Sequence, residues 1–303
     1  MDHLVVVPAT SANLGAGFDT LGVALARHLR VATGRHEGDR VVTHTGDRDG
    51  LATGDDNLVW HAFVQGCDHL GHPVPDLRLD VDNAIPLERG LGSSSSAIVA
   101  GLVLARAVAG ASVADHDLVT WATELEGHPD NVAPAVMGGL VTTATGSDGR
   151  LVVQRARPTP ALAPVVAIPV ERSRTAESRG VLPDGLGRDD LVDQLGRLSH
   201  VVGGLVGAWP LQVPLAGDRF HEAARTAGQP AAADLLEGWR EAGTFAVLSG
   251  AGPTVVGLVD ARPDRIAAAV DTVREIASTA GHAVDVEALS WDLAGARSRP
   301  RSG

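Results

Sequence analysis

The stretch PLERGLGSSSSAIVAGL, residues 86–102, most constrains how this chain can fold. Two glycines, Gly90 and Gly92, and the serines Ser93–Ser96 stand directly before an apolar, alanine-rich run. The first turn of a helix leaves backbone N–H groups unpaired and partly positive, and this geometry accepts phosphate oxygens. An ordinary strand-to-helix turn with capping serines is the alternative, but four serines exceed what capping needs. We therefore predict a phosphate-binding loop, with glycines that let the backbone approach a bulky ligand.

The chain contains no lysine, because all 25 of its Lys and Arg residues are arginine. The P-loop motif requires a lysine and is therefore excluded. The segment GLGSSSS also lacks the third glycine of the dinucleotide-binding fingerprint. The pattern by itself indicates a phosphate-binding loop on an unspecified fold.

Composition limits the class of protein. The 303 residues suit two modest domains or one large one, and 44% hydrophobic residues provide a sizeable core. The net charge of −12 argues against a general binder of nucleic acid or anionic membranes. It does not exclude an anionic ligand, since local backbone dipoles can oppose the global charge.

The remaining global signals favour a soluble protein. The single cysteine, Cys67, excludes an internal disulfide framework, and its apolar helical surroundings favour a core position over a catalytic one. No signal peptide is apparent, and the longest uncharged stretch, 201–217, is broken by prolines. We expect a cytoplasmic protein.

Periodicity and turn signals divide the chain into two lobes of α+β type. Ser112 is the predicted N-cap of a helix that stops at Gly127, and a polar turn occupies 146–150. We predict domains at 1–155 and 156–295, followed by a frayed basic tail at 296–303. The predicted strands cover 3–8, 21–31, 77–85, 138–145, 164–170, 244–250, 253–260 and 282–289, and the predicted helices 56–70, 93–108, 113–126, 190–208, 217–227, 231–242 and 263–280.

Four motifs resemble one known family. PLERGLGSSSSA resembles the P-x-x-x-G-L-G-S-S-x-A motif of the GHMP kinases, which are named for galactokinase, homoserine kinase, mevalonate kinase and phosphomevalonate kinase. LSGAGPTVVGL, 248–258, is similar to the family's glycine-rich third motif. VPATSANLGAGFDTLGVAL, 7–25, and ELEGHPDNVAPAVMGGL, 124–140, resemble the members that act on homoserine. Ala16 and Ala251 depart from the usual proline and serine without removing a catalytic group.

The resemblance implies a two-lobed GHMP kinase fold. Its N-terminal lobe would be like domain 2 of ribosomal protein S5, and its C-terminal lobe would be ferredoxin-like. ATP and L-homoserine would meet between the lobes and react to ADP and O-phospho-L-homoserine, a step towards threonine. The expected partners are thus small molecules and at most a second copy of the chain as a homodimer, with no nucleic acid and no membrane.

For the nucleotide and metal, the resemblance implies these residues. Glu126 would be a Mg²⁺ ligand with a loop serine, for which we choose Ser94; alone, a Glu on a last helical turn is usually solvated. Asn57 would contact adenine, with helix capping as the alternative. The expected nucleotide-binding loop consists of Pro86, Leu87, Glu88, Arg89, Gly90, Leu91, Gly92, Ser93, Ser94, Ser95 and Ser96.

The ammonium and hydroxyl of homoserine would bind to a second group of residues. Asp19 would pair with the ammonium, assisted by Asn13, because an unpaired buried charge is costly. Without the resemblance, SANLGAGFDT would be interpreted as a turn with an Asx cap. Asn131 would orient the hydroxyl and His128 would line the site, whereas an isolated His-Pro is usually a loop.

The carboxylate of homoserine would bind arginine, whose planar fork matches it. Arg179 in RTAESRGVLP and Arg225 in DRFHEAARTAG match the family's arginine-containing segments, and Thr175 would line the same pocket. Alone, each arginine would be interpreted as a solvated surface charge.

The resemblance assigns catalysis to Asn131, Glu126 and Asp19, and no residue clearly serves as general base. We therefore expect direct in-line attack by a positioned hydroxyl, since phosphoryl transfer depends mainly on positioning and charge neutralisation. A kinase for another small alcohol is the alternative among enzymes. A catalytically inactive ligand sensor of the same fold, and then a structural protein, are alternatives from other classes.

Overall fold

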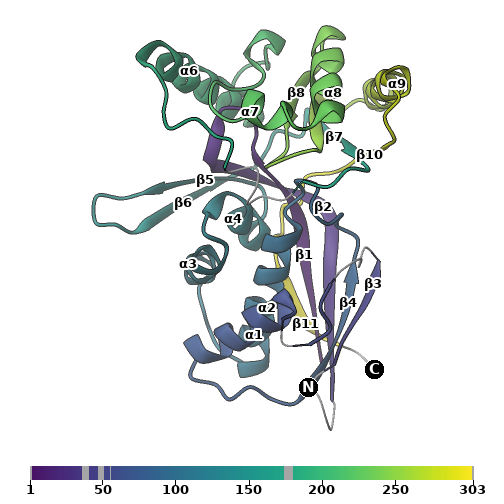
Figure 1. Cartoon of the computed structure of the whole chain (residues 1–303). Coiled ribbons are helices and arrows are strands. Elements are labelled where there is room, and N and C mark those ends of the chain that lie inside the picture. Colours follow the sequence, from purple (N-terminus) through teal and green to yellow (C-terminus); the bar gives the residue numbers. More distant parts are fainter. Residues whose placement is uncertain (1, 36–40, 47–50, 55, 174–179, 302–303) are drawn as a thin grey trace.

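The fold is built around a long antiparallel strand pair, β1 (His3–Asn13) and β2 (Gly17–Arg35), which reaches from one lobe towards the other (Figure 1). The computed structural model describes residues 2–35, 41–46, 51–54, 56–173 and 180–301. The sheet around this pair has the order β11-β1-β2-β4-β3, and β5 pairs with both β2 and β6. Its other strands are β3 (Val41–Gly46), β4 (Leu77–Asn83), β5 (Leu140–Thr145), β6 (Leu151–Ala156) and β11 (Arg297–Pro300).

Helices cover one face of this N-terminal sheet (Figure 1). They are α1 (Leu58–His69), α2 (Ser93–Ala109), α3 (Asp115–Glu126) and α4 (Pro129–Met137). Helix α2 is apolar on nearly all sides and largely buried, and at its N-terminus Ser95 and Ser96 are buried while Ser94 is exposed. On β4, Leu79 and Val81 are buried while Asp80 and Asp82 alternate with them, so one face of the strand meets the core and the other meets water.

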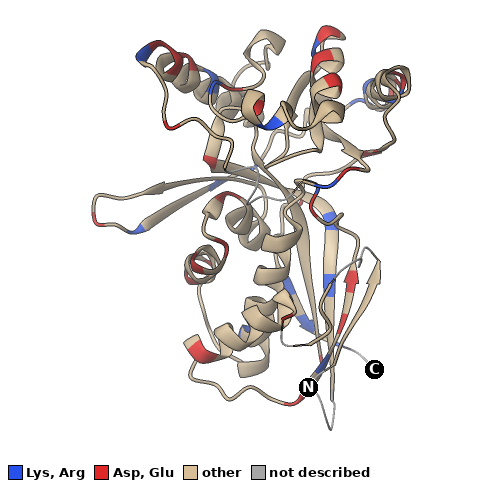
Figure 2. Cartoon of the chain, in the orientation of Figure 1, with Lys and Arg blue, Asp and Glu red and all other residues tan. Residues whose placement is uncertain are grey.

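Figure 2 shows acidic residues spread over helices of both lobes, with arginines on β2 and β11. On the outer face of the sheet, Asp80 lies 3.1 Å from Arg78 and 3.7 Å from Arg301, and Asp82 lies 3.6 Å from Arg30. The acidic net charge is therefore interleaved with arginine on this face.

The C-terminal lobe is a four-stranded antiparallel sheet of order β10-β7-β9-β8 with helices packed on it. This order, with a helix after the first and third strands, is the predicted ferredoxin-like arrangement. Trp239 on α8 is fully buried in its core. The elements are β7 (Leu162–Pro169), α6 (Arg188–Leu205), a 3-10 turn (Val213–Leu215), α7 (Glu222–Thr226), α8 (Pro230–Glu241), β8 (Phe245–Leu248), β9 (Val255–Asp260), α9 (Pro263–Ala280) and β10 (Val284–Ala288).

The structure corrects several predictions. The frayed tail is wrong for 297–300, because β11 pairs with β1 at the edge of the N-terminal sheet. The helix predicted from Ser112 begins at Asp115 after the N-cap Ala114. The helix predicted over 217–227 is only α7, since the preceding residues form turns.

Besides β11, the elements β3, β6, α4 and the 3-10 turn Val213–Leu215 were not predicted. Helix α4 begins at Pro129, where the missing N–H of proline costs nothing, so the His-Pro segment is a helix start and not a loop. Within the described residues, no helix is both long and apolar enough to cross a membrane.

Candidate active site

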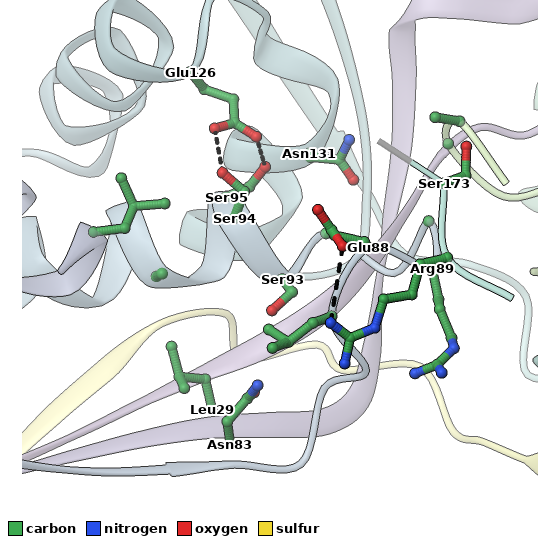
Figure 3. A pocket seen from close by; sticks show the side chains of 18 of the residues that line it. Leu29, Asn83, Glu88, Arg89, Ser93, Ser94, Ser95, Glu126, Asn131 and Ser173 are labelled. Atoms are coloured by element: carbon green, nitrogen blue, oxygen red, sulfur yellow. Dashed lines mark hydrogen bonds and ion pairs between the residues drawn. The ribbon is translucent and has the colours of Figure 1, made fainter. Parts of the chain in front are cut away.

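A cavity of about 590 Å³ opens at the N-terminus of α2 and has walls from both lobes (Figure 3). Of the predicted site residues, Pro86, Leu91 and Ser96 do not line it; Leu91 and Ser96 are fully buried elsewhere. Thr175 and Arg179 lie outside the described residues. The predicted residues that the structure brings together around the cavity are Asn13, Asp19, Asn57, Leu87, Glu88, Arg89, Gly90, Gly92, Ser93, Ser94, Ser95, Glu126, His128, Asn131 and Arg225.

The two loop glycines are required by neighbouring protein atoms. Gly90 (φ 76°) and Gly92 (φ 68°) both have left-handed backbone conformations. A Cβ on Gly90 would lie 2.2 Å from the carbonyl oxygen of Ser249, and one on Gly92 would lie 2.0 Å from Oγ1 of Thr10. Tight packing of the loop against the protein is thus a second reason for these glycines, and the approach of a ligand to their backbone stays a prediction.

The serines of the loop divide into two groups. Ser94 and Ser95 donate hydrogen bonds of 3.0 and 2.6 Å to the two carboxylate oxygens of Glu126 (Figure 3). Ser96 instead donates to the carbonyl oxygen of Pro8 at 2.9 Å and anchors the helix start to β1. One carboxylate and two hydroxyls beside unpaired helix N–H groups form a set of hard oxygen donors that suits Mg²⁺ and phosphate.

The glycine-rich segment 248–258 braces the predicted phosphate-binding loop. Oγ of Ser249 lies 2.6 Å from the carbonyl oxygen of Gly90 and 2.8 Å from Oγ of Ser11. The Thr254 N–H donates to the carbonyl oxygen of Arg89 at 3.3 Å. This hairpin turn thereby ties the loop to the C-terminal lobe.

Asn13, which also lines the cavity, joins two segments. Its Nδ2 donates to the carbonyl oxygen of Gly250 at 2.9 Å, and its Oδ1 accepts from the N–H of Asp19 at 3.1 Å. Asn13, Leu14 and Asp19 have φ values of 67°, 46° and 55°. Such conformations cost about 1–3 kcal/mol each and cluster at functional sites.

Asn131 and His128 lie on the α4 side of the cavity. Oγ1 of Thr10 donates to Oδ1 of Asn131 at 2.7 Å, which leaves the Nδ2 donor of the amide for other partners. Nδ1 of His128 lies 2.5 Å from Oδ1 of Asp130, a buried carboxylate that the sequence analysis missed. Asp130 lies two residues after His128, in the first turn of α4. Its position gave no signal of a role in the site, because acidic residues are common in first helical turns, where they interact favourably with the helix dipole. Asp19, His128 and Asp130 each offer one side-chain atom that could bind a metal ion, and these atoms lie within 4.8 Å of one another.

Two other predicted residues have clear structural contacts. Arg225 is 4% exposed; its guanidinium donates to the carbonyl oxygen of Gly250 at 2.8 Å and lies 5.4 Å from the centre of the Phe18 ring. Oδ1 of Asn57 caps α1 by accepting from Val59 and Trp60, and its Nδ2 donates to Ala52. The capping alternative for Asn57 is therefore confirmed.

Two lobes of α+β type with a cavity at the start of a helix are the arrangement expected of the small-molecule kinases that the sequence motifs indicate. The GHMP kinases N terminal domain matches residues 57–139, and the GHMP kinases C terminal domain matches 211–275. A homoserine kinase from Moorella thermoacetica is 38% identical over 88% of this chain and 90% of its own. One from Synechococcus sp. is 40% identical over 94% of each chain.

Solved structures agree with these matches. A homoserine kinase from Cytophaga hutchinsonii superposes with a TM-score of 0.86 at 26% identity, covering 98% of this chain and 97% of its own. A putative homoserine kinase from Listeria monocytogenes gives 0.78 at 29% identity, covering 99% and 100%. The chain belongs to the GHMP kinase family and, within it, to the homoserine kinases. It is an ATP-dependent small-molecule kinase, as its sequence motifs predict.

Proposed function

We propose that this protein transfers the γ-phosphoryl group of ATP to the hydroxyl of L-homoserine, giving ADP and O-phospho-L-homoserine for threonine biosynthesis. The observation that carries the proposal is the meeting of Asp19, Asn131 and Arg225 with the start of α2 around one cavity. Such a cavity offers an acid for an ammonium, an amide for a hydroxyl and an arginine for a carboxylate. ATP and an amino acid are cytoplasmic metabolites, so we expect the reaction there.

For the nucleotide, the start of α2 supplies the phosphate site. The N–H groups of Ser93–Ser95 precede the first intrahelical hydrogen bond, which Ser96 donates to Gly92, and they lie at the positive end of the helix dipole. Leu87 to Gly90 line the same cavity and would hold the rest of the nucleotide. The loop's hydrogen bonds to Ser249 and its close contact with Thr10 keep these groups in place before ATP arrives.

Glu126 with Ser94 would hold Mg²⁺, and Ser95 is a second hydroxyl within reach. The metal, when bound, would neutralise charge on the triphosphate. The hydrogen bonds from the two serine hydroxyls orient the Glu126 carboxylate at the start of α2.

The amino acid would lie with its ammonium at Asp19 and its carboxylate at Arg225, with Arg179 and Thr175 as further predicted contacts. Asn131, held by Thr10, would orient the hydroxyl, and His128 would line its path. No residue needs to act as general base if the hydroxyl attacks the γ-phosphate directly, because positioning and charge neutralisation supply most of the acceleration.

A kinase for a neutral alcohol is disfavoured by Arg225. This arginine lines the cavity, and the planar fork of a guanidinium matches a carboxylate, which a neutral alcohol does not offer. Sugars offer no carboxylate. Mevalonate offers one, but it has no ammonium to pair with Asp19.

ADP release tests the proposal. The purified chain should turn over L-homoserine with Mg²⁺ and ATP in a coupled assay, and should not turn over mevalonate, galactose or threonine at comparable rates. Asp19→Asn and Arg225→Met should each raise the KM for homoserine more than the KM for ATP. No ADP release with homoserine, or preference for another of these alcohols, would refute the proposed substrate.

A further inference from the structure

The β1–β2 loop, defined here as residues 13–19 and including Asp19 at the start of β2, belongs to the N-terminal lobe but is held by side chains of the C-terminal lobe. His221 Nε2 lies 2.9 Å from the carbonyl oxygen of Gly15, and Gln194 Nε2 donates to that of Ala16 at 2.9 Å. The residues between β1 and β2 adopt unfavourable backbone conformations that persist only when their surroundings over-determine them. These two contacts are therefore candidates for what fixes the loop.

His221 has partners on both ring nitrogens. Its side chain is fully buried, and Nε2 faces two acceptors, the Gly15 carbonyl oxygen and Oδ2 of Asp218 at 3.4 Å. Nδ1 lies 3.4 Å from Nη1 of Arg225, which can only donate. The Nε2 atom must therefore carry the hydrogen, and Nδ1 must keep its lone pair. The ring is neutral in this arrangement.

The charges around the ring are compatible with this state. Burial lowers the pKa of His221, Arg225 adds to the lowering, and Asp218 and Glu222 oppose it. Glu222 is occupied by Arg240, with both carboxylate oxygens 2.7 Å from guanidinium nitrogens.

A third contact connects the same two segments. Phe18, from the loop, packs with its ring centre 5.5 Å from that of His221 and 4.9 Å from that of Phe220. The Arg225 guanidinium lies over the same Phe18 ring, 5.4 Å from its centre. His221 thus touches the loop through both its Nε2 and its ring face, and it touches Arg225 through Nδ1.

We propose that His221, as the neutral Nε2–H tautomer, is a positioning residue that fixes Arg225 and the loop carrying Asp19 at a set spacing, and thereby makes the site specific for an α-amino acid. The inference rests on the proposed function, because it takes Arg225 as the carboxylate partner and Asp19 as the ammonium partner. His221 itself would not touch the substrate.

Two isosteric substitutions separate the two contacts. In His221→Gln the amide nitrogen reaches the position of Nε2, so the bond to Gly15 is kept and the acceptor for Arg225 is lost. In His221→Asn the amide oxygen occupies the position of Nδ1, so the acceptor for Arg225 is kept and the bond to Gly15 is lost. Glu222 is the first residue of α7 and His221 is the N-cap of that helix. Glu222→Gln weakens the pair with Arg240 and leaves the hydrogen bonds of the His221 ring in place, so it serves as the matched control.

The substrates to compare are L-homoserine and 3-aminopropan-1-ol, which keeps the ammonium and hydroxyl but lacks the carboxylate. His221→Gln should reduce the preference for homoserine, expressed as the ratio of the two kcat/KM values, by about tenfold, the loss expected for one hydrogen bond to a charged group. His221→Asn should raise the KM of both substrates, keep the ratio within about twofold of the wild-type value, and leave the KM of ATP unchanged. Glu222→Gln should lower the melting temperature and leave the ratio unchanged.

Equal losses for both substrates in His221→Gln would overturn the inference, because they would indicate a merely structural histidine. If the wild-type chain releases no ADP with homoserine, the proposed function fails instead. The tautomer remains measurable in that case from the ¹⁵N shifts of histidine-labelled protein, with His221→Gln identifying the resonance. Nε2 protonated and Nδ1 unprotonated between pH 6 and 8 supports the inference; an imidazolium or the Nδ1–H tautomer contradicts it.

Discussion

Substituting the loop glycine that precedes α2 tests whether the phosphate site depends on protein packing. Gly92 has φ 68°, and a Cβ there would lie 2.0 Å from Oγ1 of Thr10 and 3.1 Å from Oδ1 of Asn131. Gly110, at the other end of the same helix, has φ 61° and no atom within 4 Å of the corresponding Cβ position. Alanine at either position would therefore adopt the same unfavourable backbone conformation, but only alanine at 92 would also clash with neighbouring atoms.

The expected free energies follow from these contacts. Alanine in the left-handed conformation costs about 1–2 kcal/mol, which is the whole effect expected for Gly110→Ala. Gly92→Ala adds about 1–3 kcal/mol of overpacking, because Thr10 is fully buried and can move only by giving up its hydrogen bond to Asn131. The total for Gly92→Ala is about 2–5 kcal/mol.

Urea denaturation of both variants measures these free energies, and initial rates measure function. Since the displaced loop supplies the phosphate site, kcat/KM for ATP should fall on the order of a hundredfold in Gly92→Ala. Gly110→Ala should keep wild-type kinetics. If Gly92→Ala is no less stable than Gly110→Ala and binds ATP normally, the loop does not need this glycine for packing and the reasoning is wrong.

Three further predictions concern other residues. Glu126→Gln should raise the Mg²⁺ concentration needed for half-maximal rate at least about tenfold; a lower kcat with an unchanged Mg²⁺ requirement would contradict a role as metal ligand. Asn57→Ala should destabilise the fold by about 1 kcal/mol through loss of the α1 cap, measured by urea denaturation; a raised KM for ATP at unchanged stability would favour adenine contact as its main role. For Asp292, burial raises the pKa, but hydrogen bonds from His28 and two backbone N–H groups outweigh burial and lower it. Its carboxylate therefore adds stability above the unfolded pKa of about 3.9, and this is lost as pH falls through the lower folded pKa; Asp292→Asn should reduce the loss of stability between pH 5 and 2 in denaturant titrations.

Elements with local signals were predictable from the sequence. Helix α9 begins at Pro263 and ends before Gly281, as its proline, periodicity and glycine predict. The phosphate loop was recognisable because glycines, serines and an apolar run are adjacent in the chain. In contrast, RSRP in β11 carries no alternating pattern, and its pairing with β1 depends on residues almost a whole chain length away.

The same distinction applies to the site. Asp19, Glu126 and Arg225 were found because motifs mark them, and the structure brings all three to one cavity. His221 and Gln194 were not found, because their contacts with the loop are defined only once the two lobes are assembled. The reason for the loop glycines was also beyond the sequence, since Ser249 and Thr10 are far from them in the chain.

The path of the chain explains how contacts between the lobes can be kept so close. The chain enters the C-terminal lobe after β6 and returns to the N-terminal sheet as β11, so the C-terminal lobe is inserted between two strands of one sheet. On the return path, Asp292 donates its N–H to Ala24 and accepts from Gly139. Two covalent connections restrict the relative motion of the lobes more than one linker would. The site loops of the N-terminal lobe are contacted by Ser249, His221 and Gln194 of the C-terminal lobe. These contacts can therefore hold the site in its working geometry before either substrate binds, as in-line transfer requires.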